Sequence, residues 1–274
     1  MPWAPELFSA PVLARLEDKW WRENQLAVPY FAGLQTGDID ALMGSFAGEP
    51  QLHHPVRGRV KGTQAFTRFV AETNAWMDER HVSVEYVDRI LTERRGVEEV
   101  VLHLEGEAGP VDLPFALVAD RRPDGRIEEL RLYFSTWPLS GRHTNRPPLL
   151  QPDPDLREPA AVAEYQRALA AGDVDAIVRA FEPDGYVRES AGCEYINRGH
   201  EGLREYYDKL FSNDGGIPLE HCALTDDTRA CALEYNLLRR GKTELPRAGF
   251  AVYVQGGSGR LDAARIYDDA ERYA

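Results

Sequence analysis

One sequence pattern occurs twice in this chain of 274 residues, and it constrains the fold more than any other feature. The first copy runs from Tyr30 to Phe46 and the second from Tyr165 to Phe181, at a constant offset of 135 residues. A repeat of this length is far longer than the roughly 20–50 residues of a solenoid repeat. The offset therefore predicts two copies of one domain.

The residues within each copy predict a helix, a sharp reversal and a second helix. Tyr165 and Leu169 are four residues apart, which places them on one helical face. Gly172 suits the left-handed position that ends a helix, and Asp173 suits the N-cap of the next one. The first copy repeats this reversal with Gly37 and Asp38.

The length and composition fit two globular domains joined by a linker. Apolar residues make up 43% of the chain and charged residues 28%, which is enough apolar surface for two cores. We expect a first domain with an N-terminal helical extension at 1–140 and a second domain at 159–274. The segment 141–158 between them is rich in proline, so it should be extended and fairly stiff.

The charge and the apolar runs limit the partners and the compartment. A net charge of −13 disfavours nucleic acid and anionic membranes, because both require a basic surface. No apolar run approaches the roughly 20 residues that cross a bilayer, and the N-terminus lacks signal-peptide features, so we expect a cytoplasmic protein. The three cysteines lack CxxC spacing, which predicts neither disulfides nor a zinc site.

The spacing of the repeated residues resembles one known superfamily. Each copy has a Tyr, a Gly-Asp-x-Asp seven residues later, a Phe eight residues after the first Asp, and a polar residue eight residues further on. This pattern resembles the nuclear transport factor 2-like superfamily, and within it ketosteroid isomerase and the SnoaL-like polyketide cyclases. The resemblance implies an α+β fold of two tandem cones. Each cone has three helices packed on a curved mixed sheet around an apolar pocket, and the two should form an intramolecular pseudo-dimer.

The resemblance also implies candidate catalytic residues. In ketosteroid isomerase a Tyr of the first helix donates a hydrogen bond to the developing enolate, and a carboxylate of the first strand moves the proton. Tyr30 and Tyr165 match that Tyr by position. Glu189 matches the carboxylate, and His54 takes its place in the first copy, 24 residues after the Tyr in both cases. A base and a hydrogen-bond donor are what enolisation requires, although a core Tyr and a rim Glu are the plain structural alternative.

One departure from the family pattern argues against steroid isomerisation. Ketosteroid isomerase has a second oxyanion donor, a protonated Asp, for which our alignment gives Phe250 in the second copy and about Phe115 in the first. Cyclisation, epoxide opening, dehydration or another isomerisation remain open.

The later strands supply further candidates, whose side of the sheet the sequence leaves open. If we allow a two-residue deletion at the first hairpin, His103 aligns with Glu234 and Glu105 with Asn236. On a concave face these residues line the pockets, and on a convex face they meet solvent or the other domain. Tyr267 shares a strand face with Asp269, whereas Asp268 opposes them. The substrate-binding candidates are Tyr186, Glu234, Asn236, Phe250, Tyr267, Asp269, Trp76, His103, Glu105 and Tyr133.

The function that the sequence favours is a cofactor-free acid–base enzyme of secondary metabolism. It would be an isomerase, cyclase, dehydratase or epoxide hydrolase acting on a small hydrophobic metabolite in the second domain. We expect no metal, because the spacing of His54, His103 and Glu105 does not support a metal site. The alternative is a non-catalytic protein that binds a hydrophobic small molecule or serves in assembly. Further homo-oligomerisation is left open.

Overall fold

A computed structural model describes residues 30–144, 146–212, 215–240 and 243–269. The N-terminal helical extension expected for the first domain falls on residues before position 30, which lie outside the described residues. The first half of the chain forms α2 (Tyr30–Thr36), α3 (Ile39–Gly44), β1 (Gln51–His54), β2 (Gly58–Lys61), α4 (Thr63–Glu79), β3 (Ser83–Leu91), β4 (Arg95–Gly106), β5 (Gly109–Arg121), β6 (Ile127–Tyr133) and α5 (Trp137–Ser140).

The second half repeats this order of elements. It forms α6 (Ala160–Ala171), α7 (Val174–Ala180), β7 (Phe181–Arg188), β8 (Ile196–Arg198), α8 (Gly199–Phe211), β9 (Leu219–Asp226), β10 (Ala230–Arg240), β11 (Thr243–Gln255) and β12 (Leu261–Ile266).

The two sheets have the same topology, which confirms the predicted α+β fold and the duplication. Each has six strands, in the order β2-β1-β6-β5-β4-β3 and β8-β7-β12-β11-β10-β9. The pairs β1–β6 and β7–β12 are parallel and the other neighbours are antiparallel, so both sheets are mixed.

The helix reversal at the start of each domain forms as its residues predict. Gly172 has a φ of 69° and Gly37 a φ of 67°, in the left-handed region that favours glycine. The carboxylate of Asp173 accepts a hydrogen bond from the backbone N–H of Ala176 at 2.9 Å. Asp38 caps α3 in the same way. The first helix of each pair thereby places its tyrosine against the sheet.

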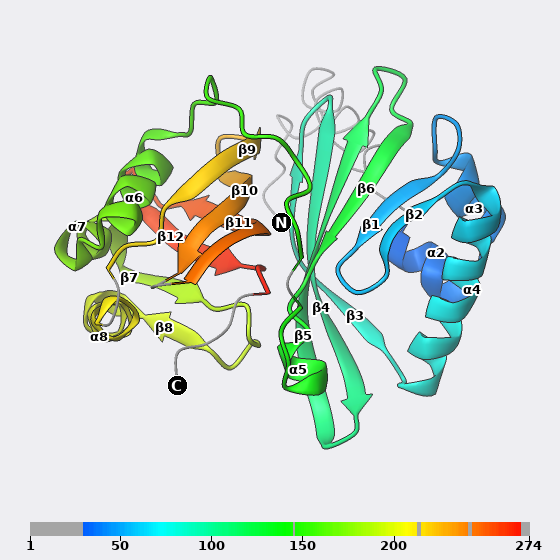
Figure 1. Cartoon of the computed structure of the whole chain (residues 1–274), viewed down its shortest axis with the longest axis horizontal. Coiled ribbons are helices and arrows are strands. Elements are labelled where there is room, and N and C mark those ends of the chain that lie inside the picture. The colour runs from blue at the N-terminus through cyan, green and yellow to red at the C-terminus, as the bar shows by residue number, and fades with distance from the viewer. Residues whose placement is uncertain (1–29, 145, 213–214, 241–242, 270–274) are drawn as a thin grey trace, which may run out of the picture.

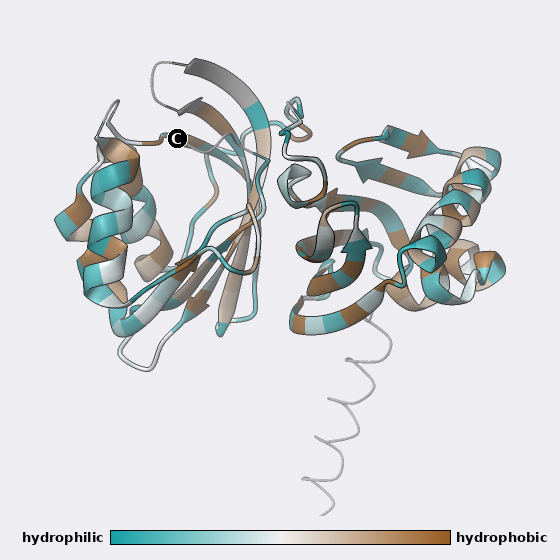
Figure 2. Ribbon diagram, turned by 90° about the horizontal axis from the view of Figure 1, so that it is seen from below, coloured by the Kyte–Doolittle hydropathy of each residue, from teal (hydrophilic) through white to brown (hydrophobic). Residues whose placement is uncertain are grey.

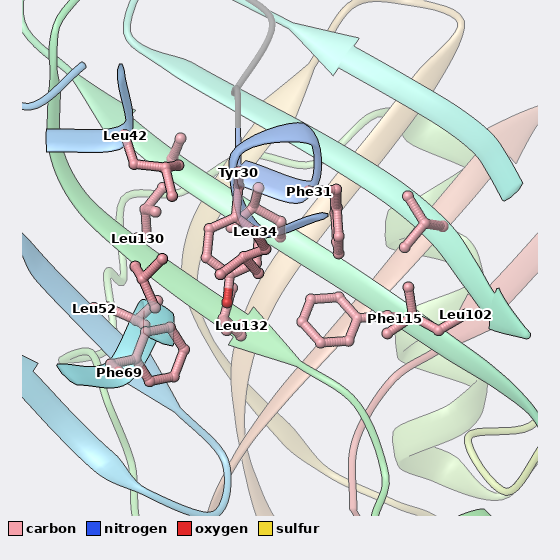
Figure 3. Close-up of a cluster of buried hydrophobic side chains, with 14 of the residues drawn as sticks. Tyr30, Phe31, Leu34, Leu42, Leu52, Phe69, Leu102, Phe115, Leu130 and Leu132 are labelled. Atoms are coloured by element: carbon pink, nitrogen blue, oxygen red, sulfur yellow. The ribbon is translucent and has the colours of Figure 1, made fainter. Parts of the chain in front are cut away.

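Each sheet packs its concave face against its own helices. In the first domain Phe31, Leu42 and Phe66 are buried in this core, and Figure 3 shows Tyr30 among Leu34, Leu132 and Phe115. A second core of the same kind forms around Tyr165 and Phe181. The helices carry both hydrophilic and hydrophobic residues, as expected for elements with one solvent face (Figure 2).

The two sheets pack against each other in the middle of the molecule, with α2, α3 and α4 at one outer side and α6, α7 and α8 at the other (Figure 1). Val118 and Val252 belong to one buried cluster at this interface. The ring of Phe250 stacks on that of Tyr133 at a centroid distance of 4.9 Å. The expected intramolecular pseudo-dimer is therefore present. It buries the face of each sheet that points away from that sheet's own helices.

Two equivalent sets of hydrogen bonds connect the sheets across this interface, each between an Arg and a Tyr of one sheet and a Glu of the other. Arg131 of the first sheet donates to Glu234 of the second from Nε at 2.5 Å and from Nη2 at 2.9 Å, and Tyr133 donates to the same carboxylate at 2.7 Å. In the other direction Arg265 and Tyr267 donate to Glu99. Each sheet thus supplies an Arg and a Tyr to the partner's Glu, as a two-fold relationship requires.

The segment between the domains is anchored to the end of the second sheet. Asp269 accepts hydrogen bonds from Ser135 Oγ at 2.6 Å and from His143 Nδ1 at 2.8 Å, and also from Thr144. Further along, the Asn236 side chain donates to the carbonyl of Leu150 at 3.3 Å.

None of the helices in the described ranges combines the length and the apolar character needed to cross a bilayer.

Candidate functional site

The cone of the first domain encloses a cavity of about 250 Å³ between its helices and its sheet. Tyr30 of α2, His54 at the end of β1 and Trp76 of α4 line it. Most of the remaining lining is apolar and includes Leu102 and Phe115. Burial raises the pKa of Tyr30 far above its ordinary value, although the charge of Arg57 opposes the rise, so this phenol remains protonated.

The cone of the second domain encloses a smaller cavity of about 70 Å³, which both Tyr165 and Glu189 line. The difference in size has a cause in the side chains. Tyr235 and Tyr253 line the second cavity, whereas the same sheet positions of the first domain carry Val100 and Ala119. The Tyr253 ring occupies space that Ala119 leaves open in the first cone, whereas the Tyr235 ring has a counterpart there in the ring of Phe115.

Tyr165 belongs to a pair of buried phenols. Its hydroxyl lies 2.8 Å from that of Tyr207 of α8, within hydrogen-bond distance. Burial raises the pKa of Tyr165 to about 12, and the hydrogen bond with Tyr207 opposes this rise. Burial and the neighbouring Tyr165 also raise the pKa of Tyr207 well above its ordinary value. Both are therefore neutral donors at neutral pH.

Glu189 follows directly after β7 and is one of the residues that line the second cavity. Its carboxylate accepts a hydrogen bond from the Asn197 side chain at 3.2 Å, and its backbone N–H donates to the carbonyl of Tyr195 at 2.9 Å. These contacts fix the position of Glu189, which is one of the residues that line the cavity. A carboxylate and two phenols thus share one largely apolar hollow.

A second carboxylate, Asp268, was not among the sequence candidates. Asp268 lines the same cavity and accepts a hydrogen bond from the Tyr235 hydroxyl at 3.2 Å. A signal for it exists in the sequence, because strand alternation sets Asp268 opposite to Tyr267 and Asp269. Those two lie at the domain interface, so the residue between them faces the cavity.

Several predicted substrate-binding residues lie away from both cavities, which corrects the prediction. Glu234, Phe250, Tyr133 and Tyr267 are buried between the two sheets, where they form the interface described above. Their strand face is convex, so it cannot reach the cone interior. Asn236 and Asp269 instead bind the segment between the domains.

The remaining predicted substrate-binding residues that do not line a cavity lie near the surface of the molecule. His103 is exposed, with Asp112 at 2.7 Å and Glu85 at 2.9 Å, and its hydrogen bonds to these two carboxylates raise its pKa. Glu105 is also exposed. Tyr186 is half-buried beneath the guanidinium of Arg198, at 4.6 Å from the ring centroid, and does not line the cavity.

The alignment of the later strands is also corrected. Glu234 and Glu99 hold equivalent positions, since Glu99 pairs with Ala116 and Glu234 with Phe250 in the same register of the two sheets. The predicted partner of Glu234, His103, lies four residues further along β4. Phe115 therefore matches Gly249 rather than Phe250.

Within the described residues, no group of three or more His, Cys, Asp or Glu side chains is arranged to hold a metal ion. Cys193, Cys222 and Cys231 are free thiols. The side chains that line the two cavities include two carboxylates, several phenols and one imidazole.

Comparison with protein families matches residues 162–260 to the SnoaL-like domain. The comparison with curated proteins gave no match. Among solved structures, the epoxide hydrolase/cyclase-like enzyme SalBIII of pyran ring formation in polyether salinomycin is 18% identical, with a TM-score of 0.34 over 42% of this chain and 91% of that one.

Two further structures are similar at the same level. A cystatin-fold protein from Novosphingobium aromaticivorans is 19% identical, with a TM-score of 0.34 over 39% of this chain and 93% of its own. An NTF2-like protein of unknown function from Cytophaga hutchinsonii is 16% identical, with a TM-score of 0.33 over 37% and 89%. These similarities are too distant to carry an argument about function.

Proposed function

We propose that this chain, whose residues 162–260 form a SnoaL-like domain, is an acid–base enzyme that acts on a small hydrophobic metabolite in the cavity of that domain. The observation that carries the proposal is that Tyr165 and Glu189 line one cavity with mostly apolar walls. The reaction is an isomerisation, cyclisation, dehydration or epoxide opening of the kind that polyketide cyclases and related enzymes of secondary metabolism perform.

The proposed roles follow from the chemistry of the groups. The Glu189 carboxylate removes a proton from carbon, and the electron pair moves onto the substrate oxygen. The Tyr165 hydroxyl donates a hydrogen bond to that oxygen as negative charge develops on it. The two hydroxyls lie 2.8 Å apart, and the proposed mechanism makes Tyr207 the donor of this hydrogen bond, so that the Tyr165 proton is directed to the substrate. Protonated Glu189 then returns the proton at a different carbon, and this cycle requires no cofactor.

The test uses the smallest probe of each class, because the cavity measures only about 70 Å³. Deuterium exchange at the α-carbons of acetone in D2O, followed by NMR, reports proton abstraction, and hydrolysis of ethylene oxide reports epoxide opening. We expect Glu189→Gln to lower the accelerated rate by about 10²- to 10⁴-fold, the usual contribution of a general base. Tyr165→Phe should lower it by about 10²-fold, as the loss of an oxyanion donor does.

The matched control is Glu205→Gln, an exposed residue of α8 outside the cavity. It should leave both rates unchanged. If the unmodified protein accelerates neither reaction, or if Glu189→Gln behaves like the control, the catalytic proposal for this cavity is wrong.

A non-catalytic role in binding a hydrophobic small molecule is the second candidate. The observation that favours it is the larger and more apolar cavity of the first domain. Binding of a hydrophobic probe without turnover in either domain would support it.

A further inference from the structure

The cavity of the first domain contains an oriented hydrogen-bond donor that the proposed catalytic site does not use. His54 is the last residue of β1, and its ring lines this cavity. Its Nδ1 lies 3.1 Å from the backbone nitrogen of Val56 and 3.2 Å from that of Arg57, and both N–H groups donate to it. A ring nitrogen that accepts hydrogen bonds carries no proton, so the neutral imidazole is protonated on Nε2.

The ring is also fixed in position by aromatic contacts. Phe69 of α4 and Phe134 pack against it edge to face, at centroid distances of 5.7 Å and 5.4 Å. Within the described ranges, no hydrogen-bond partner of Nε2 is present. The turn after β1 therefore holds one edge of the imidazole, and the other edge keeps an N–H group for a ligand.

The surroundings favour the neutral ring over the imidazolium. Burial in the cone and the charges of Arg57 and Arg146 lower the pKa of His54 to about 3. Arg57 follows the strand and pairs with Glu72 of α4, Arg146 belongs to the segment between the domains, and Tyr30 of α2 is a neutral phenol. The group that the cavity offers to a ligand near neutral pH is therefore an uncharged donor, not an acid or a base.

We propose that the cavity of the first domain binds an uncharged, apolar ligand through one acceptor oxygen, of a ketone, an aldehyde or an ether, which accepts a hydrogen bond from His54 Nε2. The cavity of about 250 Å³ has room for a ring compound, since an apolar cavity of about 150 Å³ holds benzene. A carboxylate ligand would lose its hydration among apolar walls, and Arg57 is already paired with Glu72. The inference stands whether or not the second domain is catalytic.

The probes are acetophenone and ethylbenzene, which have nearly the same shape but differ by the carbonyl oxygen. Binding to the full chain is measured by calorimetry. His54→Phe keeps the ring volume but removes the donor. We expect it to weaken acetophenone binding about tenfold, the effect of one lost hydrogen bond, and to leave ethylbenzene binding within about twofold.

His53→Phe is the control, because His53 points to Glu129, at 3.3 Å, rather than into the cavity. It should leave the binding of both probes unchanged. Equal losses for both probes in His54→Phe, or no binding of acetophenone to the unmodified protein, would overturn the proposal.

A measurement on the unmodified protein guards against a variant that fails to fold. The ¹⁵N signals of His54 should identify Nε2 as the protonated nitrogen and should stay constant between pH 5 and 8. Acetophenone should shift the Nε2 signal, and ethylbenzene should shift it much less. A protonated Nδ1, or a titration near pH 6.5, would contradict the assigned donor.

Discussion

Gly249 shows how one residue shapes the second cavity. A Cβ at this position would lie 2.2 Å from the ring of Tyr235, so only a residue without a side chain lets that ring lie across the strand. In the first domain the corresponding pair is Phe115 and Val100, in which the aromatic ring comes from the other strand. The two cones thus exchange the positions of a large and a small residue.

This arrangement leads to a prediction at the residue scale. Gly249→Ala should displace the Tyr235 ring and its hydrogen bond to Asp268, and destabilise the protein by about 1–3 kcal/mol, the usual effect of overpacking. Urea unfolding measures the loss. Gly257→Ala is the control, since nothing lies within 4 Å of its Cβ position and no loss is expected there. Equal stability of the two variants would show that the ring can move freely.

The two helix pairs show what local sequence predicts at the scale of an element. A left-handed glycine and an aspartate N-cap depend only on neighbouring residues, so both reversals follow from the sequence. The resemblance also placed His54 on the first strand, and β1 (Gln51–His54) ends at this residue. The strand face and the alignment between the domains were not predictable in the same way. Shifting the alignment by an even number of residues keeps the alternation but changes which residues are equivalent.

The N-cap of α7 gives the prediction for this scale. Asp173→Ala removes the carboxylate that accepts from Ala176 at 2.9 Å, and should cost about 1 kcal/mol of the free energy of unfolding. Asp184→Ala, at an exposed strand position, should change stability by less than about 0.5 kcal/mol in the same urea titration. If the two variants were indistinguishable, the cap would not stabilise the helix pair.

The interface between the sheets decides the arrangement of the whole molecule. Each sheet carries both parts of the charged group: Glu99 with Arg131 in the first, and Glu234 with Arg265 in the second. The pairs form across the interface, where these side chains are almost fully buried. A face of this kind is self-complementary, as the face of a symmetric dimer must be. The chain therefore keeps within one polypeptide the geometry of a dimer.

Replacing the glutamate of one set tests how much its hydrogen bonds contribute to the stability of the protein. Glu234→Gln removes the carboxylate that accepts from Arg131 Nε and Nη2, while Asp120 and Glu129 still pair with Arg131 Nη1, and should destabilise the protein by about 1–3 kcal/mol. Glu99→Gln should cause a similar loss, because Arg265 and Tyr267 are placed in the same way. Thermal and urea unfolding measure both, with Glu205→Gln as an exposed control. A neutral effect of either substitution would contradict a stabilising role for that group.

The sequence by itself determined the duplication and the helix reversals, and its resemblance to a known superfamily predicted the α+β fold. These depend on local conformation and on repeated positions, which the chain carries in its order of residues. Only the tertiary structure decided which strand face is concave, and so moved Glu234, Tyr133 and Tyr267 from a cavity to an interface. It also decided that the first cone is the roomier one. The volume of a cavity is what remains after side chains from distant elements have packed. It depends on residues far apart in the chain, so no local sequence pattern predicts it.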